Sequence, residues 1–321
     1  MDSAEFIYVP LTISQKCLQS IWHLTLSENE WGGQLFPAII DNKCQLSCDV
    51  PLIEGTGLQK HKEDVYYLGK DAPRAASVRI AVTPLYKEVF QVYPLCDSEH
   101  TINMFFHTHP LLSIRDADNL GKFAPPSLGD FFAHTILSNY RNYKQNKQLN
   151  TCVLMSFEGM YVYSILPHKF REIFKQIELL FKQLFPNPTR VEAMGYEIGE
   201  VPMAVVEKVK MDFFNDLRQP LDSFNYEMNT FLEKHADKTD TTAAPQLQDS
   251  VWNCKSCTPP LDFPFFKAIQ TPEFQCFIRN NSMVQALHSR GFTYDFFPAP
   301  FNSEITFLAS SRATFVDKRQ L

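Results

Sequence analysis

Glycine is scarce in this 321-residue chain, which has 11 glycines beside 28 phenylalanines and 21 prolines. So little glycine argues against the glycine-rich loops that cradle phosphate groups. The chain also lacks a Gly-x-Ser-x-Gly motif, a P-loop and a dinucleotide fingerprint. The many aromatic side chains instead indicate a densely packed aromatic interior.

The chain also has no long apolar run and no net positive charge. No stretch of eighteen apolar residues occurs, which argues against a membrane-spanning helix. Its 30 Lys and Arg against 36 Asp and Glu leave a formal charge of −6, so no overall basic field attracts phosphates. The acidic start Met1–Glu5 does not resemble a secretory signal. We therefore expect neither nucleic acid nor membrane as a partner, and a cytoplasmic or nuclear location.

The eight cysteines are scattered through a long chain, a pattern typical of buried thiols in a reducing compartment. Cys254 and Cys257 form the one Cys-x-x-Cys motif. A second, structural zinc held by this pair with Cys276 and His288 stays a weaker alternative, because the remaining spacings are irregular.

Alternating and helical patterns predict an α/β (α+β) fold with a mixed sheet. Ser14 and Ser127 are placed to cap two helices of this region. Glu158-Gly159 is the predicted turn of the last hairpin. The predicted strands cover residues 5–12, 31–40, 44–53, 101–109 and the hairpin 151–165. The strands 31–40 and 44–53 are predicted to form a hairpin with its turn at Asp41-Asn42-Lys43.

The apolar period changes from two to 3.6 after residue 165, which predicts a domain of residues 1–165 and a helical extension of residues 166–234. The extension either packs back on the domain or joins a partner in a multi-subunit assembly. Residues 235–250 have almost no large apolar side chains and predict a flexible linker. Residues 251–321 form a C-terminal region to which the sequence assigns no role.

Two short motifs carry the chemistry. His107 and His109 lie two apart at the end of a predicted strand, so both imidazoles can point to one place. Asp130 lies one helical turn after the cap Ser127. Two His and one Asp form a three-ligand zinc site that leaves a fourth position for water, as catalytic zinc sites do.

Each motif also has a structural interpretation. His-x-His occurs among ordinary packed residues, and Ser127 with Asp130 resembles a capping box, although Glu or Gln is the usual reciprocal partner. The order of strand, His-x-His-Pro, loop, Ser-x-x-Asp and helix is much more specific than either motif alone. His134, one turn beyond Asp130, is expected to pack beside the site and not to bind metal.

These residues resemble the JAMM (MPN-plus) metalloprotease family, in which an upstream Glu precedes His-x-His-Pro and Ser-x-x-Asp. Glu30 begins the similar upstream element Glu-Trp-Gly-Gly-Gln-Leu. The resemblance covers about residues 5–165 and implies an MPN-like curved sheet flanked by helices. It implies that His107, His109 and Asp130 bind one catalytic Zn²⁺.

The resemblance also implies the remaining roles. Glu30 would be the general base, and Ser127 would donate a hydrogen bond to the oxyanion. The reaction would be hydrolysis of an isopeptide bond, most often one that joins ubiquitin or a relative to a lysine. A protease for another peptide bond and a non-catalytic MPN-type scaffold subunit stay open as alternatives.

The chain departs from the family pattern in two places. Residues 110–126 separate His109 from Ser127 by more than is usual, so residues 111–124 are either a lid or exosite, or they displace Asp130. Glu28 competes with Glu30 for the role of base. We favour Glu30, because the spacing to Gly33 and Leu35 follows it.

Overall fold

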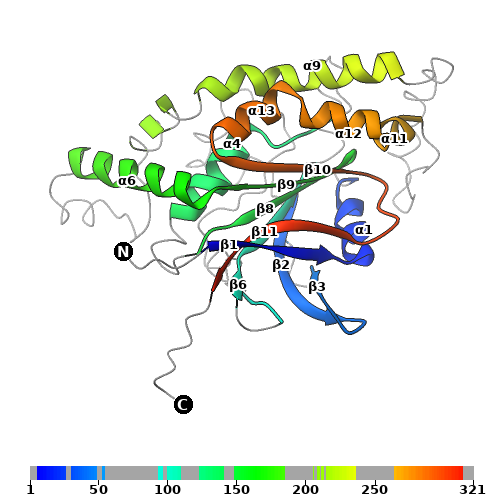
Figure 1. Ribbon diagram of the computed structural model, residues 1–321, viewed down its shortest axis with the longest axis horizontal. Helices are drawn as coiled ribbons and strands as arrows, with labels where there is room; N and C mark the ends of the chain where they lie inside the picture. The colour runs from blue at the N-terminus through cyan, green and yellow to red at the C-terminus, as the bar shows by residue number, and fades with distance from the viewer. Residues whose placement is uncertain are drawn as a thin grey trace.

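The computed structural model shows a mixed α/β fold, in which helices pack around one curled sheet (Figure 1). The coarse prediction of a mixed sheet flanked by helices is confirmed. The structure describes residues 6–26, 30–48, 53–54, 93–96, 100–109, 123–140, 148–184, 205, 208–209, 211–212, 215–235 and 264–313.

The first strand and helix form where the sequence predicts them. Strand β1 (Phe6–Ile13) leads directly into helix α1 (Gln15–Leu24). The Ser14 hydroxyl accepts a hydrogen bond from the Cys17 backbone N–H at 3.2 Å, which makes Ser14 the N-cap. The buried face of α1 is apolar and includes Trp22, so this helix is held by the core.

The predicted hairpin after α1 is also present. Strands β2 (Trp31–Ile40) and β3 (Lys43–Ser47) pair antiparallel around Asp41 and Asn42. Both turn residues have positive φ, 51° and 59°, a conformation that Asp and Asn tolerate in tight hairpin turns. The second strand is shorter than predicted, because Ile53–Glu54 forms strand β4 against the start of β2 instead.

Ten strands of the sheet follow one another in a single hydrogen-bonded order, and an additional short strand, β4, pairs with β2. Three neighbouring strands of the sheet are β7 (Met104–Thr108), β8 (Thr151–Ser156) and β9 (Gly159–Ile165). Two short strands, β5 (Tyr93–Pro94) and β6 (His100–Ile102), lie at one edge. The order is β10-β9-β8-β7-β2-β3-β1-β11-β6-β5.

The last two strands come from the C-terminal region. Strand β10 (Phe292–Pro298) pairs antiparallel with β9, and β11 (Ile305–Ala313) pairs antiparallel with all eight residues of β1. The boundary predicted at residue 165 therefore separates strands that pair with one another. Within the described residues, the sheet is built from both ends of the chain.

Four helices of the second half of the chain lie together over one side of the sheet. Helix α9 (Arg218–His235) follows the short 3-10 turn η4 (Asn215–Leu217) and contacts α11 (Pro264–Ile269) and α13 (Ser282–Ser289). In Figure 1, α9 lies over α12 (Pro272–Arg279) and α13, which in turn lie over β10. Helix α9 thus packs against helices of the C-terminal region, and whether the extension also joins a partner stays a prediction.

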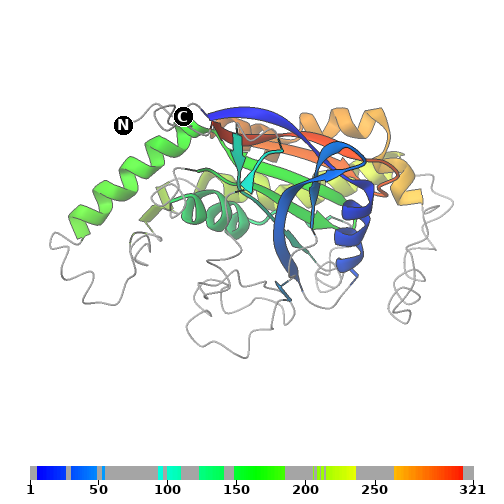
Figure 2. The same ribbon diagram turned by 90° about the horizontal axis from the view of Figure 1, so that it is seen from below.

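Helix α6 (Pro167–Leu184) begins the predicted helical extension. Its Phe170, Ile173 and Ile177 are buried, whereas Leu179 nearer its end is exposed. Figure 2 shows the helix extending away from the sheet at one end of the molecule. No helix among the described segments is both long and apolar enough to cross a membrane.

The predicted aromatic interior is confirmed. The buried ring of Phe274 in α12 stacks with Phe123 at a centroid distance of 6.0 Å, and it meets Phe231 of α9 and Phe296 of β10. This aromatic cluster joins the C-terminal helices to Phe123, which precedes Ser127 by four residues.

The described cysteines include one pair that the sequence did not indicate. Cys44 at the start of β3 and Cys96 after β5 form a disulfide, and Cys48 and Cys276 are not buried, so among the described cysteines the expectation of buried thiols holds for Cys17 and Cys152. Cys254 and Cys257 lie outside the described residues, as do Glu28 and residues 236–250 of the predicted linker.

Candidate metal centre

His107 lies in strand β7, and His109 follows directly after the end of this strand. Strand β7 pairs with β2 on one side and with β8 on the other, so its backbone is fixed on both edges. His107 is 2% exposed, and the backbone N–H of His109 donates to the Met155 carbonyl at 2.9 Å just beyond the strand. The two imidazole centroids lie 5.2 Å apart. The predicted placement of both rings on one side of the strand is confirmed.

Asp130 enters the site from the short helix α4 (Leu128–Asp130). Its backbone N–H donates to Ser127 Oγ at 3.1 Å, and the Ser127 backbone N–H donates to Asp130 Oδ2 at 2.7 Å. These reciprocal hydrogen bonds are a capping box with Asp in the place of the usual Glu or Gln. The cap therefore fixes the carboxylate, and the chain continues as a π-helical segment, η3 (Phe131–Leu137).

The carboxylate lies between the two imidazoles. Asp130 Oδ1 is 3.4 Å from His107 Nε2, and Asp130 Oδ2 is 3.4 Å from His109 Nε2. One potential ligand atom from each of the three residues lies within 4.8 Å of the other two. The structure thus brings together the three predicted ligands in a group that could hold a metal ion.

The donor set fits a transition metal. Neither ring nitrogen of His107 makes a hydrogen bond within the described part of the chain, although both are buried. Buried polar atoms are normally satisfied, so an imidazole in this state is suited to bind an ion. Two imidazoles and one carboxylate suit zinc but also other divalent metals, and the geometry does not select among them.

Charge is concentrated at this cluster. Burial opposes the charged form of Asp130, but the adjacent His107 and His109 hold its pKa well below the usual range. Burial also opposes protonation of His109, but its hydrogen bond to Asp130 and the charges of Asp130 and Glu30 raise its pKa to about 9. In the absence of a metal, the cluster is therefore an ion pair.

Glu30 lies beside the histidines at the start of β2. Gly32 pairs with His107, and the Trp31 backbone N–H donates to Thr108 Oγ1 at 2.8 Å. Continuing this register places Glu30 opposite His109. Glu30 is 8% exposed, and its charge contributes to the raised pKa of His109. Four of the five predicted site residues are thus close together, and Ser127 joins them through its hydrogen bonds with Asp130.

His134 packs beside the site, as expected. Its ring lies 4.7 Å from that of His107, and its Nδ1 is 2.8 Å from the Tyr163 hydroxyl. Burial, together with the charge of His107, lowers its pKa to about 3. A neutral imidazole engaged with Tyr163 supports the position of His107 and does not add a ligand.

The sequence did not indicate two residues behind His109. The Ala124 carbonyl is 3.0 Å from His109 Nδ1, and the Ala124 backbone N–H donates to the carboxylate of Glu158 at 2.6 Å. Ala124 is a small residue in the predicted insert, and the sequence pattern identifies Glu158 only as a turn residue. Their role depends on a backbone contact between distant segments, for which no local sequence signal exists. Residues 110–122 lie outside the described residues.

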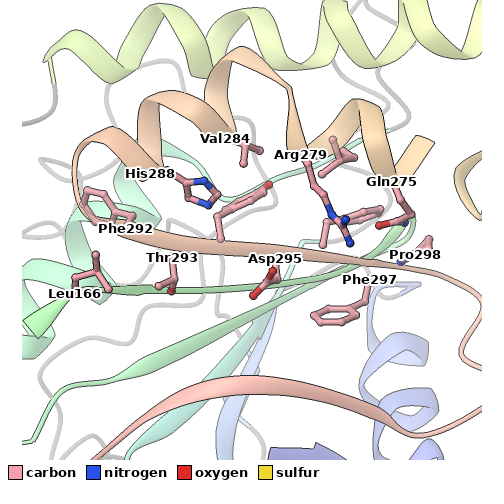
Figure 3. A pocket seen from close by; sticks show the side chains of 13 residues that line it. Leu166, Gln275, Arg279, Val284, His288, Phe292, Thr293, Asp295, Phe297 and Pro298 are labelled. Atoms are coloured by element: carbon pink, nitrogen blue, oxygen red, sulfur yellow. The ribbon is translucent and has the colours of Figure 1, made fainter. Parts of the chain in front are cut away.

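A cavity of about 730 Å³ lies elsewhere, between α12, α13 and β10. In Figure 3, Arg279 and His288 extend from the two helices toward the strand that carries Asp295. None of the five predicted site residues lines this cavity. His288 belongs to it, while Cys276 is an exposed thiol on α12, so neither supports a second zinc on its own.

The chain matches no protein-family model and no curated protein. The resemblance to JAMM proteases therefore rests on its motifs alone.

Proposed function

We propose that this chain is a JAMM-type zinc hydrolase of isopeptide or peptide bonds, with an MPN-like domain. The observation that carries the proposal is the convergence of His107, His109 and Asp130, from β7 and α4, with ligand atoms within 4.8 Å. Zinc in that group would supply Lewis-acid activation of water near neutral pH. Glu30, buried next to His109, supports the assignment because the reaction also needs a base.

Each polar residue then has a defined task. His107, His109 and Asp130 hold the ion. Glu30 accepts the proton of the attacking water and returns it to the leaving amine. The Ser127 hydroxyl already accepts a hydrogen bond from Asp130 through a lone pair, so it retains its proton to donate to the oxyanion.

The substrate class comes from the motif resemblance. By that resemblance, the scissile bond joins the C-terminus of ubiquitin or a ubiquitin-like protein to a lysine, in the cytoplasm or nucleus. The mixed sheet flanked by helices is compatible with an MPN-like domain. Strands β10 and β11 would then be additions from the second half of this chain.

A non-catalytic scaffold is the second candidate, and a specific observation favours it. Asp130 already pairs with both histidines and closes the capping box with Ser127, so the cluster has a structural use without metal. A scaffold would be a stably folded protein that takes up no zinc and purifies with partner subunits.

The two candidates are separated by metal analysis combined with a substrate panel. We expect the parent to contain about one zinc per chain and to cleave a member of a panel of ubiquitin-like conjugates and linear peptides. Glu30→Gln should keep the zinc and lose the cleavage. Glu304→Gln makes the same chemical change at a carboxylate that contacts Lys43 and Gln45, and it should keep both properties. A Glu30→Gln protein that cleaves as fast as the parent would remove Glu30 from the role of base.

A further inference from the structure

Glu158 is a fully buried carboxylate for which the proposed reaction has no use. It lies in the turn between β8 and β9 and is 0% exposed. One oxygen, Oε1, accepts hydrogen bonds from the Ala124 backbone N–H at 2.6 Å and from the Tyr161 hydroxyl at 2.7 Å. A buried carboxylate is costly unless its contacts require it, so its position calls for a function.

The backbone of this turn is held from two directions. The indole N–H of Trp22 donates to the Phe157 carbonyl at 2.9 Å, and the Ala299 backbone N–H donates to the Glu158 carbonyl at 2.9 Å. Helix α1 and the end of β10 therefore fix the turn. Glu158 is a rigid acceptor to which a less regular segment can be attached.

The segment attached to it is the one that returns from the insert to Ser127. Phe123 is 2% exposed and stacks on Phe274, while the next peptide group is bound by Glu158 through the Ala124 N–H. The Ala124 carbonyl then faces His109 Nδ1 at 3.0 Å and also accepts from Ser156 Oγ at 2.6 Å. One residue, Ala124, thus connects the buried carboxylate through its N–H with a proposed metal ligand through its carbonyl.

We propose that Glu158 is a positioning residue of the metal centre, which holds the Ala124 carbonyl as the acceptor for His109 Nδ1–H. The proton on Nδ1 is then hydrogen-bonded to the Ala124 carbonyl. This leaves Nε2 of the same ring facing Asp130, 3.4 Å away, where the ion would bind. Metal-binding histidines commonly donate their second N–H to a carboxylate or a backbone carbonyl, which fixes the tautomer and ring orientation. Here the carboxylate acts on the ring through one intervening residue, Ala124.

Glu158→Met tests this role, because methionine has a similar volume but no acceptor oxygen. We expect the Ala124 amide proton to lose its protection from exchange and the His109 Nδ1 proton signal to broaden or vanish in NMR spectra. Zinc affinity should fall roughly tenfold to a hundredfold, the usual range for a lost outer hydrogen bond. Glu158→Gln retains one acceptor oxygen and should restore all three readouts to near the parent values.

Tyr161→Phe is the matched control. It removes the other hydrogen bond of the same Glu158 oxygen but leaves the Ala124 contact, so it lowers stability without the expected loss of zinc affinity. A folded Glu158→Met protein with an unchanged Ala124 amide, an unchanged His109 signal and parent-like zinc affinity would overturn the proposal. So would a Tyr161→Phe protein that loses as much zinc affinity as Glu158→Met.

The inference rests on the proposed metal site, yet the two can fail separately. A parent protein that binds no zinc contradicts the proposed function, while the two NMR signals of the metal-free protein still test Glu158. If Glu158→Met does not fold, a comparison of the Ala124 amide shift in the parent and in Glu158→Gln tests the contact instead. The Ala124 amide shift should follow the ionisation of Glu158 in the parent and stay constant in the Gln variant, and equal behaviour of the two proteins would exclude the contact.

Discussion

Asp130, which is partly buried, and Glu158, which is fully buried, are two carboxylates on either side of His109 and Ala124, and the groups around them differ in charge. Asp130 faces two imidazoles, which hold its pKa well below the usual range. Glu158 faces a peptide N–H and a phenol, and burial raises its pKa to about 7. Burial is common to both, so the neighbouring groups decide which carboxylate keeps its charge.

The difference separates two tasks. A carboxylate that is charged and close to two imidazoles can hold a cation, whether that is a protonated His109 or a metal ion that displaces the proton. A carboxylate that faces only neutral donors serves as a hydrogen-bond acceptor. A carboxylate therefore binds a cation where it is supplied by α4, and it positions the backbone of Ala124 where it is supplied by the β8–β9 turn.

The largest effect should come from neutralising Asp130. In metal-free protein near pH 7, Asp130→Asn removes the carboxylate that keeps His109 charged, so the ion pair is lost and the free energy of unfolding should fall by roughly 3 to 5 kcal/mol. Glu158→Gln makes the same change at a carboxylate whose hydrogen-bond donors are neutral and on which the charge of His109 has only a minor effect, so it should lower this free energy by much less. Urea unfolding of both variants measures the contrast, and equal losses would contradict it.

The pH dependence of stability should come next in size. The pKa of Glu158 rises from its ordinary 4.5 to about 7 on folding, because burial disfavours the carboxylate. The protonated form therefore favours the folded state below pH 4.5, and this contribution is lost as the pH rises through 7. At about 1.36 kcal/mol per pKa unit, this contribution amounts to about 3 kcal/mol.

Glu158→Gln isolates that contribution. Relative to the Gln variant, the parent should lose stability between pH 5 and pH 8, as measured by urea unfolding of the metal-free proteins. The nearby Tyr161 and Tyr294 have pKa values well above 10, so neither titrates in this window. The charge of His109 also acts on Glu158, but His109 is present in both the parent and the Gln variant, so its own titration contributes to both stability curves. A constant difference between the two would mean that Glu158 is ionised throughout.

The smallest effect should come from the cap beside Asp130. Ser127→Ala removes the acceptor for the Asp130 backbone N–H and should cost about 1 kcal/mol of stability. Ser20→Ala is a suitable control, because Ser20 lies within α1 and bonds only to the preceding turn at Lys16. Thermal unfolding compares the two, and a Ser127→Ala loss no larger than that of the control would mean that the cap does not hold Asp130.

Much of the first half of the fold could be predicted, because its signals are local. Ser14 and Ser127 cap helices, Asp41 and Asn42 form the hairpin turn, and His107 and His109 share one side of a strand. Each of these features depends on residues within a few positions of one another. The three candidate ligands could be predicted for the same reason, together with the order of the elements that carry them.

The C-terminal strands could not be predicted in the same way. Phe292, Tyr294 and Phe296 do alternate with less buried residues in β10, but aromatic neighbours hide the pattern. The partner of β11 is β1, almost 300 residues earlier in the chain, and no local periodicity specifies such a pairing. The role of Glu158 was hidden as well, because a Glu before a Gly in a turn is normally solvent-exposed.

The most direct test of the metal centre is the zinc content of the parent and of His107→Ala, after both have been incubated with zinc and dialysed. The site predicts about one zinc per chain in the parent and less than about a tenth of that in the folded variant, since the carboxylate and one imidazole alone bind zinc weakly. A folded parent without zinc, or a His107→Ala protein that keeps a full equivalent, would contradict the assignment of His107, His109 and Asp130 as a metal centre.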